Sequence, residues 1–196
     1  MGSKLPELRG KGLNLGCGEN KIVGCLNVDV DPKVKPDKVF DILKKFPLAS
    51  DTIDFVLLFH TIEHIEKPLH AQVLIEIFRV LKPGGYLIVS YPEFLKCVKN
   101  WRTNFHGQQD FWEATLYGRQ GSDWDYHVCI MHTEHFVLTL RNCGFMIQKV
   151  FSEPKEPFNT VVVAEKRVLT LREDLLRREI FNDKKSVSHT SSRKSR

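Results

Sequence analysis

Glycine, aspartate and histidine residues stand where successive apolar runs end in the first third of the chain. Gly16 and Gly18 follow the first run, and glycines there let the backbone turn sharply and approach a ligand closely. Asp29 ends the second run, where a carboxylate can accept hydrogen bonds from both hydroxyls of a ribose. Asp41 follows the third run, where a carboxylate can bind the exocyclic amine of adenine, and His60 ends the fourth. This order of residues predicts a site for an adenosine-containing ligand.

Apolar runs that alternate with helical patterns predict the elements that position these side chains. Near-continuous apolar runs are typical of buried parallel strands, and apolar residues three or four apart are typical of helices. The predicted strands cover residues 12–15, 25–30, 38–40, 54–59, 86–90, 145–151 and 160–164, and the predicted helices cover 68–81 and 133–144. The sequence therefore predicts an α/β protein with a mostly parallel sheet, helices on both faces and a C-terminal antiparallel hairpin.

The predicted binding residues all lie at the carboxyl ends of strands. Ligands of open α/β sheets bind in the crevice beyond those ends, so we expect the residues to converge there. Each residue taken alone would be an ordinary turn or capping residue. Their joint order along one α/β pattern carries the prediction.

The predicted domain covers residues 1–166, and residues 92–132 interrupt its rhythm. This segment holds all three tryptophans of the chain. It is either an inserted lid or substrate segment, or a local aromatic core that covers one end of the sheet. A C-terminal helix is predicted over 167–181. The tail, 182–196, carries four of the five net positive charges and is too polar to bury a core, so it is predicted to be disordered.

Composition excludes several classes of protein. Outside the tail the chain is nearly neutral, so its charge does not indicate a strongly basic nucleic-acid groove. No apolar run is long enough to span a bilayer, so we expect no membrane partner. The five cysteines are odd in number and include no close pair, as in a protein with reduced thiols. We therefore expect a cytoplasmic protein.

The ordered motifs resemble those of the class I S-adenosylmethionine-dependent methyltransferases, in particular the small Methyltransf_11-like proteins. The resemblance covers residues 12–91 well and extends more loosely to about 165. Its motifs are LNLGCG at 13–18, NVD at 27–29, DI at 41–42, DF at 54–55, EHI at 63–65 and RVLKPGG at 79–85. The last of these is the most specific, and in the family it closes a helix and holds no cofactor.

The resemblance implies a Rossmann-like, seven-stranded sheet and S-adenosylmethionine as the cofactor. It implies that the glycine motif lines the methionine part of the cofactor, that Asp29 binds the ribose, and that Asp41 with the amide of Ile42 binds adenine. The backbone near His60 would face the methionine amine. The implied cofactor-binding set is Asn14, Gly16, Cys17, Gly18, Asp29, Asp41, Ile42 and His60.

The chain departs from the family pattern at three places. Asn14 stands where the family usually has an acid, which weakens charge pairing to the cofactor amine. Asp29 follows Gly18 by only eleven positions, so the first crossover helix must be very short or absent. Asp31 lies close to Asp29 and is an alternative ribose ligand, although strand phase and motif position favour Asp29.

Methyl transfer requires mainly that the nucleophile be aligned and water excluded, and a base is needed only for some acceptors. His60 at the crevice and His127 after the aromatic segment are candidate bases, and each could equally be a hydrogen-bonded structural histidine. His127, His132 and His135 with Asp125 match no familiar set of metal ligands, so no metal site is predicted.

The predicted function is methyl transfer to an unidentified acceptor. A small molecule bound by the aromatic segment is favoured, and a protein or RNA brought in by the basic tail is second. The motif that follows the fourth strand in DNA amino-methyltransferases is missing, so a DNA base is not expected. One alternative is a non-catalytic S-adenosylmethionine-binding module. A nicotinamide-dependent dehydrogenase is another, but Lys21 replaces the third glycine that its fingerprint requires.

Overall fold

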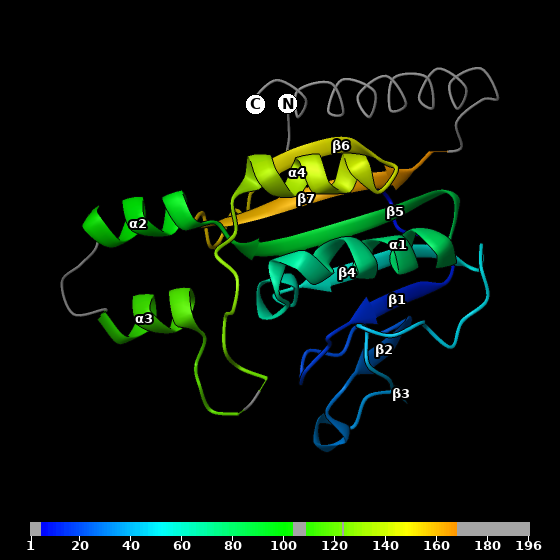
Figure 1. Ribbon diagram of the computed structural model, residues 1–196, viewed down its shortest axis with the longest axis horizontal. Helices are drawn as coiled ribbons and strands as arrows, with labels where there is room; N and C mark the ends of the chain where they lie inside the picture. The colour runs from blue at the N-terminus through cyan, green and yellow to red at the C-terminus, as the bar shows by residue number, and fades with distance from the viewer. Residues whose placement is uncertain (1–4, 104–108, 123, 168–196) are drawn as a thin grey trace, which may run out of the picture.

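The computed structural model describes residues 5–103, 109–122 and 124–167, and its framework is one seven-stranded sheet (Figure 1). The strands are β1 (Gly12–Leu15), β2 (Cys25–Asp29), β3 (Lys38–Val39), β4 (Ile53–Phe59), β5 (Leu81–Pro92), β6 (Phe145–Ser152) and β7 (Asn159–Lys166). Their order in the sheet is β3-β2-β1-β4-β5-β7-β6. All seven predicted strands are confirmed, and β5 begins earlier than predicted.

Strand direction also agrees with the prediction. The pairs β1–β2, β2–β3, β1–β4 and β4–β5 are parallel. The C-terminal hairpin is antiparallel, since β7 lies between β5 and β6 and runs opposite to both. The sheet is therefore mostly parallel, and every parallel strand directs its carboxyl end toward the same edge.

Two helices, α1 (His70–Val80) and α4 (Thr133–Asn142), pack on one face of the sheet (Figure 1). On α1, apolar side chains three or four positions apart, among them Val73 and Ile77, are fully buried against that face. The helix ends at Val80, and Lys82-Pro83-Gly84-Gly85 lies in the first part of β5. Arg79 holds this corner, because its guanidinium pairs with Glu76 at 2.7 Å and donates to backbone carbonyls of the preceding loop. The RVLKPGG motif at 79–85 thus has a structural role here.

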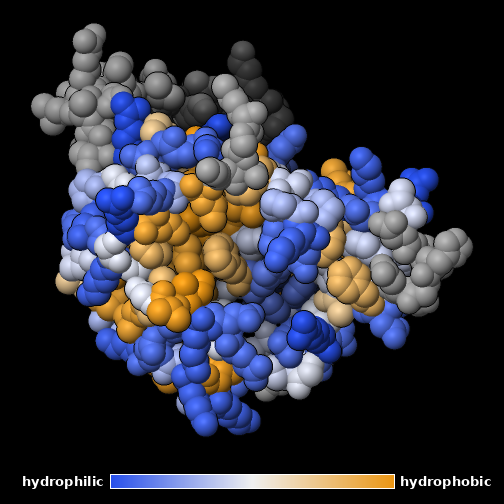
Figure 2. Space-filling model, turned by 180° about the vertical axis from the view of Figure 1, so that it is seen from behind, coloured by the Kyte–Doolittle hydropathy of each residue, from blue (hydrophilic) through white to orange (hydrophobic). Residues whose placement is uncertain are grey.

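The opposite face of the sheet carries a second, smaller apolar cluster formed by strand residues. No helix among the described residues contributes to this cluster, whereas α1 and α4 both contribute to the core on the first face. Figure 2 views the molecule from behind and shows apolar side chains gathered in the middle of that side. The described helices that pack on the sheet therefore lie on one face, because the first connections are too short to form crossover helices.

Residues 16–24 join β1 to β2 without a helix, which confirms the prediction that this crossover helix is very short or absent. An asparagine pair holds this loop against the sheet. The side-chain amide of Asn14 donates to the carbonyl of Asn20 at 3.1 Å and to Asn27 Oδ1 at 3.0 Å. Asn27 Oδ1 also accepts from the backbone amide of Ile22 at 2.8 Å, and the side-chain amide nitrogen of Asn27 donates to Asp37. Both asparagines are buried, and their hydrogen bonds hold the loop at the place where a crossover helix would otherwise pack.

The segment 92–132 forms α2 (Phe94–Thr103), α3 (Gln109–Tyr117) and a loop that returns to α4. Trp112 is buried against Phe158, with ring centroids 5.2 Å apart, as in a local aromatic core. Trp124 is exposed and faces the carboxyl edge of the sheet, as a lid residue would. The segment therefore contributes Trp112 to an aromatic cluster and Trp124 to the carboxyl edge of the sheet.

The predicted helix 167–181 and the tail 182–196 lie outside the described residues, except for Arg167. Within the described residues, every helix is too short or too polar to cross a bilayer.

Candidate functional site

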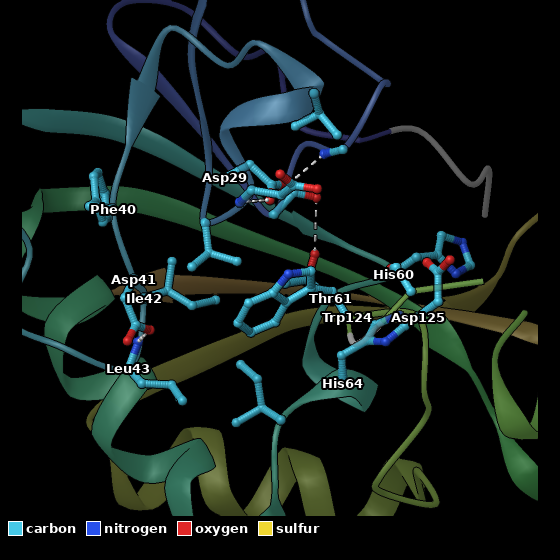
Figure 3. Close-up of a pocket in the computed structure, with 17 residues that line it drawn as sticks. Asp29, Phe40, Asp41, Ile42, Leu43, His60, Thr61, His64, Trp124 and Asp125 are labelled. Carbon is cyan, nitrogen blue, oxygen red and sulfur yellow. Dashed lines mark hydrogen bonds between the residues drawn. The ribbon is translucent and has the colours of Figure 1, made fainter. Parts of the chain in front are cut away.

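A cavity of about 270 Å³ opens at the carboxyl edge of the sheet, where the ends of β1, β2 and β4 meet (Figure 3). Figure 3 shows Phe40, Asp41 and Leu43 at one end and His60, His64 and Asp125 at the other. The lining residues are Gly16, Gly18, Asp29, Val30, Asp31, Val34, Phe40, Asp41, Ile42, Leu43, His60, Thr61, His64, Ile65, Ser122, Trp124 and Asp125. The structure thus brings together six of the eight residues predicted for cofactor binding.

The glycine turn forms one wall of the cavity, and its two glycines serve different purposes. Gly16 has φ +64°, and a Cβ at this position would lie 2.4 Å from Cγ2 of Thr61. The Thr61 hydroxyl donates to the carbonyl of Leu15 at 3.2 Å, which ties the turn to the end of β4. Gly18 has φ +49°, and a Cβ there would meet no atom within 4 Å. Gly16 is required by packing, whereas Gly18 leaves open space beside the cavity.

Asp29 is anchored at the end of β2 by two backbone amides. Its carboxylate accepts from Gly18 N at 2.8 Å and from Asp31 N at 3.0 Å, so its oxygens have a defined orientation. Asp31 also lines the cavity, but its carboxylate caps the short 3₁₀ helix η1 (Pro32–Val34) by accepting from Lys33 N at 2.9 Å. Asp29 is therefore tied to the glycine turn, whereas Asp31 is tied to the helix that follows it.

Apolar side chains surround a single carboxylate at the opposite end of the cavity. Asp41 accepts from Leu43 N at 2.9 Å, which closes a tight turn, and it lies 3.6 Å from the Lys44 ammonium. Phe40, Ile42 and Leu43 line the same end. An apolar slot with one oriented acceptor has the chemistry expected for an adenine site.

His60 begins the loop after β4 and is held in a left-handed conformation, with φ +49°. Its backbone amide donates to Ser90 O at 2.9 Å, so this strained position is fixed by the neighbouring strand. A non-glycine residue in this conformation is uncommon, and such positions concentrate at functional sites.

The imidazole of His60 lies among carboxylates. Its Nδ1 is 3.4 Å from Glu63 Oε1, and its Nε2 is 3.4 Å from the amide nitrogen of Asn159. Burial lowers the pKa of His60, but the nearby carboxylates of Glu63, Glu153 and Glu156 outweigh burial and raise the pKa above its ordinary value. A histidine so placed at a cavity wall can accept a proton from a bound molecule.

The second candidate base, His127, does not line the cavity. Its ring lies edge-on to that of His64, with centroids 4.6 Å apart, and His64 itself lines the cavity. Burial is the main cause that lowers the pKa of His127. Of the two candidate bases, His60 therefore lines the cavity and His127 does not.

Asn14 and Cys17 also lie outside the cavity lining. Asn14 is committed to the loop contacts described above, and Cys17 is buried, with the pKa of its thiol raised mainly by burial. Sequence reasoning placed them in the cofactor site because they belong to the glycine motif. It missed Phe40, Thr61 and Trp124, and of these only Trp124 had a signal, as part of the aromatic segment.

A seven-stranded α/β sheet with a glycine turn and an oriented aspartate at its carboxyl edge defines a class I methyltransferase fold. Comparisons with known proteins agree. Residues 13–89 match the family model described as a methyltransferase domain. A "Probable S-adenosylmethionine-dependent methyltransferase" of Mycolicibacterium smegmatis is 44% identical over 50 residues, which are 26% of this chain and 19% of the relative. The match thus spans about a fifth of that relative.

Solved structures show the same fold. A SAM-dependent methyltransferase of Methanosarcina mazei superposes with a TM-score of 0.58 at 18% identity, covering 81% of this chain and 93% of the other. One from Thermotoga maritima gives 0.55 at 22% identity, covering 83% and 84%. At these identities the solved structures show the fold, and the match to the methyltransferase family model covers residues 13–89 of the chain.

Proposed function

We propose that this chain transfers the methyl group of S-adenosylmethionine to a small-molecule acceptor bound at the His60 end of the cavity. The observation that carries the proposal is the carboxyl-edge cavity itself, in which the glycine turn and the anchored carboxylate of Asp29 stand side by side. Gly16 and Gly18 would line the methionine part of the cofactor, Asp29 would bind the ribose, and Asp41 with Ile42 would bind adenine.

The loop after β1 favours this cofactor over a nicotinamide dinucleotide. Dinucleotide folds bind the pyrophosphate at the N-terminus of the helix that follows the glycine turn. Residues 16–24 form no helix here, so the site offers no helix dipole to a pyrophosphate. S-adenosylmethionine has no phosphate and does not need such a helix dipole.

The cofactor supplies an electrophilic methyl carbon, and the residues at the His60 end align the acceptor with it. The acceptor's nucleophilic atom bonds to the methyl carbon as the carbon–sulfur bond breaks, leaving S-adenosylhomocysteine. His60 takes up the proton that the acceptor loses, and the carboxylate of Glu63 stabilises the resulting imidazolium.

Charge at this end of the cavity favours a neutral or cationic acceptor. Asp125 lines the cavity, and Glu63, Glu153 and Glu156 all raise the pKa of His60, so an anion would meet several carboxylates. A protein or RNA acceptor recruited by the basic tail is the second class, and the tail lies outside the described residues.

The test has two stages. Calorimetry with S-adenosylhomocysteine should show one site per chain, and absence of binding at millimolar concentration would contradict the proposal. Transfer from methyl-labelled cofactor into a size-fractionated cell extract should then label small molecules, and His60→Gln should lower that transfer without abolishing cofactor binding. Label in the protein or RNA fraction would instead support the second class. Binding without any transfer would support the non-catalytic alternative.

A further inference from the structure

Three potential metal ligands meet beside the cavity, at the end where the acceptor is proposed to bind. Glu63 and His64 belong to the short 3₁₀ helix η2 (Ile62–His64), and His127 lies in the loop that follows α3. One ligand atom from each residue lies within 4.8 Å of the other two. His64 also lines the cavity, so the cluster is continuous with the proposed acceptor site.

Glu63 is the least expected member of this cluster, because its carboxylate is buried. The residue is 1% exposed, and neither carboxylate oxygen has a hydrogen-bond partner among the described residues. One oxygen of the carboxylate makes an ionic contact with His60 Nδ1, at 3.4 Å. A buried carboxylate is costly unless it is paired, hydrogen-bonded or bound to a metal. Among the described residues, the second oxygen of Glu63 thus lacks the cation or hydrogen-bond donor that would stabilise it.

Both histidines are oriented in the way that metal ligands usually are. Nδ1 of His64 lies 2.9 Å from the carbonyl of Tyr126, which favours a proton on Nδ1 and leaves the Nε2 lone pair available. His127 makes a backbone hydrogen bond to Thr115, which occupies one of its ring nitrogens and leaves the other. Metal-bound histidines commonly donate their second N–H to a backbone carbonyl in this manner.

The backbone around the cluster is held by hydrogen bonds from both segments. The carbonyl of Glu63 accepts from Val128 N at 3.0 Å and from Cys129 N at 3.1 Å. His127 N donates to Tyr117 O at 3.0 Å. These bonds fix the loop that carries His127 against η2, so the three ligands are positioned before any ion binds.

We propose that Glu63, His64 and His127 bind a divalent transition-metal ion of the zinc class, with a fourth position left for the acceptor. Bonds of about 2.1 Å in a tetrahedral site separate ligand atoms by about 3.4 Å, and the three ligand atoms lie within 4.8 Å of one another. A carboxylate with two imidazoles is a ligand set that such ions accept. This inference rests on the proposed function only for its fourth ligand, a small molecule whose nucleophilic oxygen or nitrogen would coordinate the ion.

The proposal departs from the expectation that the chain has no metal site. That expectation considered His127 together with His132, His135 and Asp125, which are neighbours in sequence. The structure instead pairs His127 with two residues that precede it by more than sixty positions.

Metal binding is tested directly on the untagged full chain after chelator treatment. Calorimetry with Zn²⁺ should show one site per chain, and Co²⁺ should give the intense visible absorption of a four-coordinate site. Glu63→Gln and His127→Asn should each weaken binding of either ion by at least about 100-fold. His127→Asn alters a side chain that is only partly buried, so it remains informative if Glu63→Gln does not fold.

The matched control is His135→Asn, which changes an exposed histidine outside the cluster and should leave metal binding unchanged. Absence of stoichiometric binding, or an equal loss in the control variant, would overturn the proposal. S-adenosylhomocysteine binding reports separately on the proposed function. A chain that binds the metal but not the nucleoside would refute that function and retain the metal site, and the reverse result would refute only the metal site.

Discussion

Replacing Asp29 with alanine should sharply weaken cofactor binding, because this carboxylate has two acceptor positions left for the ribose. An ionised carboxylate offers about four lone-pair sites. Gly18 N and Asp31 N occupy two of them, at 2.8 and 3.0 Å. The remaining two can accept from the two ribose hydroxyls.

The size of the effect follows from these two bonds. A hydrogen bond to a charged group contributes about 1.5–3 kcal/mol. Loss of two such bonds should therefore cost at least about 3 kcal/mol, which is roughly a 150-fold increase in the Kd for S-adenosylhomocysteine. Asp31→Ala removes a carboxylate that caps a short helix, so its effect on Kd should be below about fivefold.

Calorimetric titration of both variants with S-adenosylhomocysteine measures this difference. Asp29→Ala also removes the partner of Gly18 N, so thermal unfolding must show that the variant is folded. Asp29→Asn, which keeps one side-chain oxygen as an acceptor, should lose less affinity than the alanine variant. Equal, small losses at positions 29 and 31 would refute the assignment of the ribose site to the end of β2.

Three further predictions concern neighbouring features. Gly18→Val should abolish cofactor binding in a folded protein, since the added atoms enter open space beside the cavity. Gly16→Val should instead unfold the chain, because its side chain would clash with Thr61. Calorimetry measures the loss of binding, and circular dichroism measures the loss of folding. Cofactor binding should change the tryptophan fluorescence, because Figure 3 shows the Trp124 indole lying across the cavity. Trp124→Phe should remove most of this change. If the variant shows the same fluorescence change as the wild type, the cofactor binds elsewhere. Burial lowers the pKa of His70 from its ordinary value of 6.5, so the unfolded chain binds this proton more readily than the folded one. As pH falls through 6.5, urea unfolding should show that the wild type loses stability relative to His70→Gln, and a pH-independent difference would contradict this sign.

The short β1–β2 connection shows how far sequence reasoning reached on the fold. Eleven positions between Gly18 and Asp29 cannot accommodate a loop, a full helix and a second strand, so the missing helix could be predicted by counting. The consequence for the sheet was not predicted. The face that carries no helix among the described residues depends on which side each crossover would have covered, and strand periodicity carries no information about that.

For the site, position along the chain was sufficient for six residues and misleading for two. Each of the six ends a parallel strand or follows one within three residues, and all six line the cavity: Gly16, Gly18, Asp29, Asp41, Ile42 and His60. Asn14 and Cys17 belong to the same motif as the two glycines, but they do not line the cavity. The side chain of Asn14 turns to the asparagine pair under the loop, and alternation along a strand sends neighbours to opposite faces.

The sequence by itself determined the elements, the mostly parallel sheet and the carboxyl-edge location of the site, because periodicity and strand ends are local properties of a chain. Only the tertiary structure decided what faces the cavity from a distance. Trp124 reaches the cavity from the aromatic segment, and Glu63, His64 and His127 meet because backbone hydrogen bonds dock one loop on another. Such contacts join residues more than sixty positions apart, and their spacing in sequence does not determine their distance in space.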